Sequence, residues 1–423
     1  MTEATNTEPW FHLLQQAQGF EFCAFYHSNG IKNPYSAFDW ILACGHDGLS
    51  IQHPEFNQLL DWIEKHESEY RFGVLGYDLK NAFENLESNN QALLDTPDAV
   101  FFVPQHLYRC KNGLLECVLT PFPELVREPV SPLSGIGFEW KSLCPESEYF
   151  HNFEKIQTAL QQGDLYEINY CRAFETQLPQ NFNGPQAFAR LLDHNPSAFS
   201  AYFKAGRFEL LCASPERFLW KENQLIISEP IKGTAARSPK PETDKQLAQN
   251  LLNSEKERRE NVMIVDLVRN DLSRICHPGT VGVESLFEIR SLPHVHQMVS
   301  TICGQLNPNT GFGDIIKACF PMGSMTGAPK IAAMELAEKL ENFKRGWYSG
   351  SVGYLNPNGD FDFNVIIRSI VTDHFSRKAY MAAGGAITIL SQPESEWNET
   401  ELKAYSVQNA FMRSDSRLGL AKH

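Results

Sequence analysis

Two short acidic motifs have a spacing that suits a divalent cation. Glu257 and Glu260 stand three residues apart in a charged segment, and Glu396 and Glu399 repeat this spacing near the end of the chain. On a helix, residues i and i+3 share a face, so two such helices can bring four carboxylates to one hard cation such as Mg²⁺. The alternative for each pair by itself is a solvated helix face.

A lysine and a glutamate are candidates for covalent and acid–base chemistry. Lys232 precedes Gly233 and Thr234 in a Pro-Ile-Lys-Gly-Thr turn, where glycine lets a ligand approach the backbone. A partly desolvated lysine amine is a nucleophile, and the alternative is a solvated turn lysine. Glu216 stands near a predicted strand end and becomes an acid–base group if burial raises its pKa. The alternative for Glu216 is an ion pair with Arg217.

Two further segments suit the binding of carboxylates. Residues 323–330 (Gly-Ser-Met-Thr-Gly-Ala-Pro-Lys) predict a Gly-rich turn that enters a helix, where free N–H groups together with Ser324 and Thr326 can hold an anion. The alternative is a tight turn with a helix cap. Arg368 lies within an apolar strand, and a buried arginine needs a carboxylate, from a ligand or from the protein itself.

Other common catalytic patterns are missing from the sequence. There is no G-x-G-x-x-G, no phosphate loop, no G-x-S-x-G and no H-E-x-x-H. The net charge of −14 over 423 residues repels phosphate backbones and anionic lipid, so no nucleic-acid or membrane partner is expected. A local pocket for a small anion stays possible where a metal or several donors converge.

The elements that must position these residues alternate irregularly along the chain. Helices are predicted over 56–68, 147–162, 243–273, 329–343 and from 396. Strands are predicted over 21–26, 71–77, 99–102, 350–355, 361–371 and 379–389, and over 201–227 with breaks at 214–216 and 221–223. Mixed runs of this kind indicate an α+β fold. A Pro- and Ser-rich stretch, 121–134, is the best linker candidate.

The sequence features also indicate a compartment. No basic segment followed by an apolar one opens the chain, and no apolar run reaches the length of a membrane helix. The ten cysteines form no C-x-x-C pair, so we expect reduced, mostly buried thiols and a cytoplasmic location.

Taken together and in this order, the motifs resemble those of the chorismate-utilising enzymes. The resemblance is strong over about 147–407 and implies a sandwich of large antiparallel sheets flanked by helices. It implies a chorismate-binding catalytic domain at 145–410 and an N-terminal anthranilate-synthase-like region at 1–130, intertwined with it. The implied Mg²⁺ ligands are Glu257, Glu260, Glu396 and Glu399. The implied substrate-binding residues are Gly233, Thr234, Ser324, Thr326, Tyr348, Arg368, Gly384 and Gly385.

Lys232 decides the branch within this family. Anthranilate-forming members have alanine at this position, whereas Pro-Ile-Lys-Gly-Thr is similar to members that aminate chorismate to 4-amino-4-deoxychorismate, the precursor of p-aminobenzoate and folate. Glu260-Asn261 in place of Glu-His points the same way. The resemblance implies that Lys232 attacks ring carbon C2 while Glu216 assists departure of the C4 hydroxyl. The alternatives are an anthranilate synthase component of tryptophan biosynthesis and a non-catalytic regulatory protein.

Ammonia is the second substrate that this chemistry implies. The chain has no Gly-x-Cys-x-Gly nucleophile of a glutamine amidotransferase. The resemblance therefore implies a separate glutaminase subunit, in a heterodimer with this chain.

Some positions match a tryptophan pocket of certain relatives, and others depart from the family pattern. The matching positions are Ser28, Tyr35, Ser36, Phe38, Ala198, Phe199 and Ser200. Ala37 stands where such relatives have arginine, which argues against tryptophan. Glu167 stands where amine-transferring members have glutamine and water-adding members have lysine, so isochorismate synthesis is not expected. Gln297 replaces a histidine that many relatives have.

Overall fold

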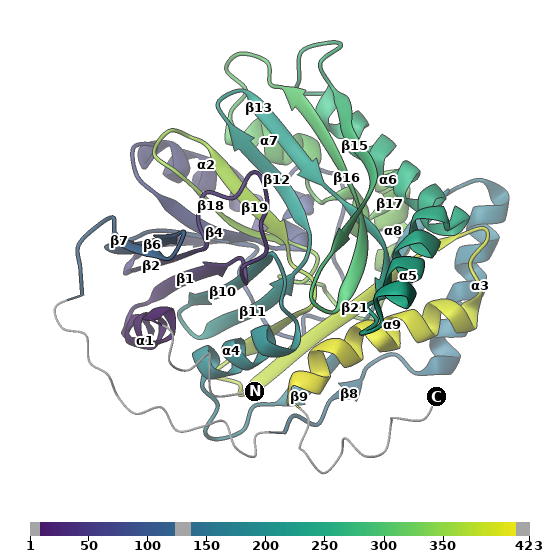
Figure 1. Cartoon of the computed structure of the whole chain (residues 1–423), viewed down its shortest axis with the longest axis horizontal. Helices are drawn as coiled ribbons and strands as arrows, with labels where there is room; N and C mark the ends of the chain where they lie inside the picture. Colours follow the sequence, from purple (N-terminus) through teal and green to yellow (C-terminus); the bar gives the residue numbers. More distant parts are fainter. Residues whose placement is uncertain (1–8, 123–136, 412–423) are drawn as a thin grey trace.

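The chain folds into two large antiparallel sheets that pack face to face and are flanked by helices (Figure 1). This computed structural model describes residues 9–122 and 137–411. The predicted α+β sandwich is confirmed. The linker predicted over 121–134 lies, except for its first two residues, outside the described part of the chain.

The first sheet has eleven strands, which come from both halves of the chain. β17 at one edge pairs with β9, and β7 closes the other edge. In spatial order the strands are β17 (Gly327–Ala328), β9 (Glu167–Gln177), β21 (Lys378–Thr388), β20 (Ser369–Asp373), β11 (Phe208–Ser214), β10 (Phe199–Ala205), β1 (Phe22–His27), β2 (Trp40–Gly45), β6 (His106–Lys111) and β7 (Leu114–Cys117), with β8 (Lys141–Ser142) beside β9.

The second sheet has ten strands and also combines the two halves of the chain. In spatial order these are β14 (Ile231–Ala236), β16 (Val295–Gln305), β13 (Leu225–Glu229), β12 (Arg217–Glu222), β19 (Phe361–Val365), β18 (Ser351–Leu355), β4 (Arg71–Leu75), β5 (Ala99–Val103) and β3 (Asp47–Ile51), with β15 (Gly282–Ser291) beside β16. Strands before residue 120 thus join both sheets. The boundary between the two predicted domains stays a prediction.

The core lies between the sheets, where alternate side chains of each strand meet. Phe203 and Cys171 of the first sheet belong to the same buried cluster as Phe72, Phe101 and Phe363 of the second. Smaller clusters lie under the flanking helices. The helices are α1 (Pro9–Gln16), α2 (Phe56–Lys65), α3 (Glu146–Gln162), α4 (Gly184–His194), α5 (Pro241–Asn253), α6 (Glu255–Ser273), α7 (Phe312–Cys319), α8 (Lys330–Leu340) and α9 (Pro393–Gln408).

The single long helix predicted over 243–273 is wrong, because two helices occupy this range. Ser254 adopts extended backbone angles between α5 and α6, and its hydroxyl accepts a hydrogen bond from the backbone N–H of Glu257. Serine is a preferred N-cap because it satisfies a helix N–H that has no carbonyl partner. The break matters for the site, because it makes Glu257 a first-turn residue of α6.

The strand predicted over 361–371 is also interrupted. β19 ends at Val365 and β20 begins at Ser369, and Arg368 between them has φ = +50°.

Two further predictions concern the cysteines and membrane-spanning helices. Eight of the ten cysteines are buried, and all ten are free thiols, as expected. Among the described residues, no helix combines the length and the apolar character that a membrane crossing requires.

Candidate functional site

Lys232 is presented by a bulge at the edge strand β14. The pairing of β14 with β16 slips between Ile231 and Thr234, and Gly233 within the slip has φ = +89°. A Cβ at Gly233 would come within 2.9 Å of Glu257 Oε2, so a side chain at this position would meet the neighbouring helix. Bulges re-aim side chains. This bulge explains both the glycine and the inward direction of Lys232.

The Lys232 ammonium is nearly buried and pairs with Glu167 on β9. Nζ lies 2.9 Å from Glu167 Oε1, and the two side chains are 11% and 1% exposed. The alternative of a solvated turn lysine is therefore wrong. Burial lowers the pKa of Lys232, but the carboxylates of Glu167 and Glu260 outweigh this effect and hold the pKa above that of a free lysine. The resting side chain is an ammonium.

Glu216 is a buried acid beside this lysine. It lies in the turn between β11 and β12, and Ser324 Oγ donates a hydrogen bond of 2.6 Å to Glu216 Oε1. Burial raises the pKa of Glu216 to about 7, although the Ser324 hydroxyl and the Lys232 ammonium lower it. The carboxyl is thus poised to hold or release a proton near neutral pH. The alternative ion pair with Arg217 is not formed, because that guanidinium bonds Glu229 and Asp362.

Three of the four predicted metal ligands, Glu260, Glu396 and Glu399, lie around the ammonium of Lys256, and the Glu257 carboxyl is close enough for Lys256 and Glu399 to affect its pKa. Lys256 Nζ is 3.0 Å from Glu396 Oε1, 3.7 Å from Glu260 Oε1 and 4.0 Å from Glu399 Oε2. In the described residues, no three acidic, histidine or cysteine side chains converge closely enough to form a ready metal site. The carboxylates are neighbours that surround a lysine and do not share one point.

The environment of these glutamates differs from a solvated helix face. The Glu260 and Glu396 side chains are 8% and 1% exposed, and Glu260 Oε1 and Glu396 Oε2 have no hydrogen-bond partner. Burial raises the pKa of Glu260 to about 7, whereas the Lys403 ammonium lowers the pKa of Glu399. Buried carboxylate oxygens without partners are costly unless a cation or donor joins them. This donor set suits a hard cation such as Mg²⁺.

In the Gly-rich turn, the Ser324 side chain bonds the acid Glu216, and the Thr326 side chain stabilises the turn itself. Residues Gly323–Met325 form a 3₁₀ turn, and Ser324 faces Glu216. The Thr326 hydroxyl donates to the carbonyls of Met322 and Gly323, and the N–H groups of Met325 and Thr326 also bond within the turn. Of the donors predicted here, Ser324 is therefore the one already directed at the acid.

Arg368 supplies a cation that the described protein does not neutralise. Its side chain is half-buried, burial lowers its pKa, and no carboxylate of the described residues lies within ion-pair distance. Backbone bonds join Ile366 N to Gly350 O and Ala213 N to Arg368 O, which places the loop beside the Tyr348 segment and the strand that leads to Glu216. An ion pair with a carboxylate of the described protein is not formed, and binding of a ligand carboxylate stays a prediction.

The paired glycines of β21 lie close to other predicted residues. A Cβ at Gly385 would approach Glu396 Oε2 at 3.5 Å, and one at Gly384 would lie 2.5 Å from Cys171 Sγ. The same Cys171 thiol lies 3.9 Å from the buried Tyr348 hydroxyl. The two glycines therefore have different neighbours: Gly385 leaves space beside the glutamates of α9, and Gly384 allows close packing against Cys171 on β9. Thr234, by contrast, is exposed on β14 and pairs with Gln297.

Six of the seven positions matched to a tryptophan pocket line one small cavity of about 40 Å³. They are Ser28, Ser36, Phe38, Ala198, Phe199 and Ser200, and Ala37 lines it too. Tyr35 does not, because its hydroxyl donates to Glu284 and its ring contacts Trp220. Binding of an amino acid in this cavity stays a prediction.

Two lysines of the site were not identified from the sequence. Lys256 lies four residues before Glu260, and Lys403 lies four residues after Glu399. Lys403 Nζ also donates to the carbonyl of Gly384 at 2.9 Å. A lysine at i+4 or i−4 from a glutamate on a helix is common and usually exposed, so this spacing alone does not distinguish these residues.

Comparisons with known proteins extend over this whole region. Residues 45–409 match the family described as chorismate binding enzyme. Aminodeoxychorismate synthase component 1 of Salmonella typhimurium is 41% identical over 339 residues, which cover 78% of this chain and 73% of that protein. Anthranilate synthase component 1 of Aquifex aeolicus is 32% identical over 366 residues, with 80% and 73% covered.

A solved structure gives the same result at the level of the fold. Anthranilate synthase component I of Streptococcus pneumoniae aligns with a TM-score of 0.76 at 25% identity, and the alignment covers 89% of this chain and 93% of that chain. The residues matched to the family include Lys232, Glu216 and both glutamate pairs.

Proposed function

The chain belongs to the chorismate-binding enzymes, and from this premise we propose that it aminates chorismate to 4-amino-4-deoxychorismate, which feeds p-aminobenzoate and folate synthesis. The observation that carries the proposal is the buried Lys232 ammonium between Glu167 and the acid Glu216. A lysine nucleophile beside a protonated carboxyl suits displacement of the C4 hydroxyl through a covalent ring intermediate.

The proton movements can be assigned to residues of this chain. Lys232 has to be a free amine to attack C2, and Glu167 Oε1, 2.9 Å away, is the carboxylate oxygen that can take its proton. Formation of the C2–N bond shifts the ring double bonds and breaks the C4–O bond, and Glu216 donates the proton with which the hydroxyl leaves as water. Ammonia then bonds to C4 as the C2–N bond breaks. Glu216 takes a proton from the new ammonium, and Glu167 returns one to Lys232.

The residues present fit a divalent cation, and we propose that Glu257, Glu260, Glu396 and Glu399 hold Mg²⁺. The buried oxygens Glu260 Oε1 and Glu396 Oε2, which have no hydrogen-bond partner, support this assignment. When bound, the ion binds the ring carboxylate and offsets negative charge that builds up on the ring. Arg368, which has no carboxylate partner in the described residues, is proposed to bind a further carboxylate of the substrate.

The ammonia donor and the location follow as proposals. Relatives named component 1 imply a second component, and we propose that it is a glutamine amidotransferase that delivers ammonia to this chain. A cytoplasmic location stays a prediction.

The test uses the purified chain with chorismate, Mg²⁺ and an ammonium salt. We expect loss of chorismate without release of pyruvate and without anthranilate fluorescence, because the enolpyruvyl ether survives. Anthranilate formed at a rate comparable to chorismate loss would show the alternative, an anthranilate synthase component. Absence of turnover even with a competent glutaminase would show a non-catalytic regulator.

A further inference from the structure

Lys256 occupies the position around which the proposed metal ligands gather. It lies in the first turn of α6, directly before Glu257, and its ammonium contacts carboxylates from both helices. Glu396 Oε1, at 3.0 Å, accepts its hydrogen bond. Every ion pair of Lys256 in the described residues is with one of the four proposed ligands.

The contacts have a clear electrostatic reason. Glu396 is 1% exposed and Glu260 is 8% exposed, so their mutual repulsion is poorly screened by water. One ammonium offsets part of this repulsion and links carboxylates of α6 and α9. Glu396 Oε2 and Glu260 Oε1 still have no hydrogen-bond partner, so one lysine does not satisfy the cluster.

The lysine can leave without a change of fold. Its side chain is 38% exposed, against 11% for Lys232, so rotation about its side-chain bonds carries the ammonium into solvent. A divalent ion brings twice the charge and can bind carboxylate oxygens from both helices at once.

We propose that Lys256 is an internal counter-cation that holds three of the four glutamates, Glu260, Glu396 and Glu399, in the metal-free protein and has to be displaced when the divalent cation binds. Lys256 therefore sets the metal affinity of the site. The inference rests on the proposed metal role of the glutamates. The apparent affinity for the divalent cation is then the intrinsic affinity multiplied by the fraction of molecules in which the lysine has left the cluster.

The test compares Lys256→Met with Arg259→Met as a matched control. Both variants remove one positive charge from α6, but Arg259 is 57% exposed and pairs with Glu255 on the outer face. Mg²⁺ binding to the metal-free proteins is measured by calorimetry, and Mn²⁺ binding by electron paramagnetic resonance, both without substrate. If Lys256 occupies the cluster in about nine molecules of ten, Lys256→Met binds about tenfold more tightly than wild type. Arg259→Met stays within about twofold of wild type.

Thermal unfolding provides a second measurement. In EDTA, Lys256→Met has a lower Tm than wild type because the glutamates lose their counter-charge, and saturating Mg²⁺ removes the difference. Equal or weaker metal binding by Lys256→Met overturns the inference, as does an equal gain in Arg259→Met. If wild type binds no Mg²⁺, the inference and the metal assignment both fail. Chorismate amination by wild type, measured separately, still decides the proposed reaction.

Discussion

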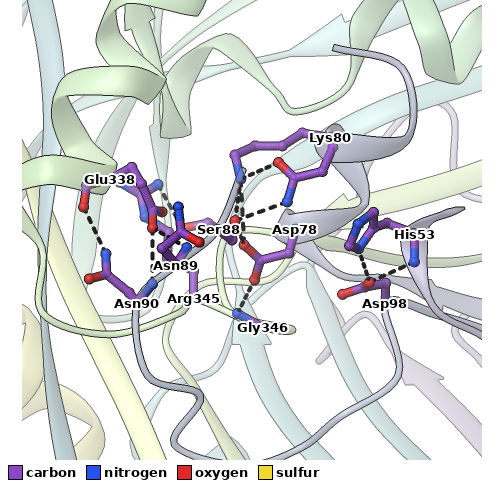
Figure 2. Close-up of polar contacts among 12 residues, drawn as sticks. His53, Asp78, Lys80, Ser88, Asn89, Asn90, Asp98, Glu338, Arg345 and Gly346 are labelled. Carbon is purple, nitrogen blue, oxygen red and sulfur yellow. Dashed lines mark hydrogen bonds and ion pairs between the residues drawn. The ribbon is translucent and has the colours of Figure 1, made fainter. Parts of the chain in front are cut away.

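Two buried lysines of this molecule, Lys80 and Lys232, lie in opposite kinds of polar environment. Lys80 Nζ, in the 3₁₀ segment Tyr77–Ala82, has three oxygen partners, on Asp78, Asn81 and Ser88. The other oxygen of Asp78 accepts a hydrogen bond from the N–H of Gly346. The ammonium of Lys80 and both carboxylate oxygens of Asp78 therefore have hydrogen-bond partners (Figure 2).

Lys232 has one hydrogen-bond partner in the described residues, Glu167, whose second carboxylate oxygen has none. Both lysines are nearly buried, so burial does not distinguish them. The difference is the number of hydrogen bonds completed within the protein. The Lys80–Asp78 cluster, whose hydrogen bonds are complete, holds the segment that leads to Tyr348. The Lys232–Glu167 pair, whose hydrogen bonds are incomplete, keeps a donor and an acceptor for a ligand.

Among the substitutions that test this difference, Lys232→Ala has the largest expected effect on the amination rate. Amination falls by about 10⁴-fold or more, because removal of a covalent nucleophile eliminates the pathway. Intact-protein mass spectrometry with chorismate and no ammonia detects an adduct in wild type and none in the variant. Lys221→Ala, which removes a lysine paired with Asp360 outside the site, is the control and keeps the adduct. An adduct that persists without Lys232 would contradict its role.

Glu216→Gln is expected to lower the amination rate and, above neutral pH, to raise the stability of the fold. The rate falls about 10²- to 10⁴-fold because amide replaces the acid, and the wild-type kcat declines above pH about 7 as Glu216 ionises. The folded pKa of about 7 exceeds the reference value of 4.5, so the folded state loses stability as pH rises from 4.5 to 7 and the loss stays constant above 7.

The variant is therefore more stable than wild type at pH 8, by up to about 3 kcal/mol, and the two are close at pH 4.5. Urea unfolding at both pH values measures the difference. An equal stability difference at the two pH values would mean that Glu216 does not titrate in this interval.

Lys80→Met tests the satisfied cluster. It leaves the buried Asp78 carboxylate without its cation, and we expect a loss of about 3–5 kcal/mol in the free energy of unfolding, measured by urea titration. The double variant Lys80→Met/Asp78→Leu recovers part of this loss, because it leaves no unpaired charge. The adduct at Lys232 still forms in the folded variant. Loss of the adduct at full stability would place Lys80 in the catalytic machinery.

Arg368→Met has the smallest expected effect. Loss of one charge-assisted contact to the substrate raises KM for chorismate about 10- to 100-fold. Stability stays the same or rises, since no described carboxylate depends on this arginine and burial of its unpaired charge is costly. Arg345→Met is the contrasting control, because that buried guanidinium bonds Glu341 and two backbone carbonyls, and its loss destabilises the fold. A similar loss of stability in both variants would remove the distinction.

Local patterns predicted much of the secondary structure. The amphipathic segment at 147–162 is α3, the apolar run at 71–77 contains β4, and the run at 99–102 covers β5 except for its last residue. The break at Ser254 was missed even though Ser-x-x-Glu is itself a helix-start pattern, because the helical periodicity continues across it. Lys232, Glu216 and Ser324 were each identified from a local motif, and the structure brings them together.

The sequence by itself determined the α+β class, the residue types of the site and the family, because these depend on local periodicity and on motifs with fixed spacing. Only the tertiary structure decided which charges meet. Glu167 and Lys232 are 65 residues apart, and Lys256 and Glu396 are 140 apart. Sheet pairing, the packing of α6 on β14 and β16, and the packing of α9 on β21 set these contacts, and no local pattern encodes a distance of that kind. Burial, which raises the pKa of Glu216, is likewise a property of the whole fold.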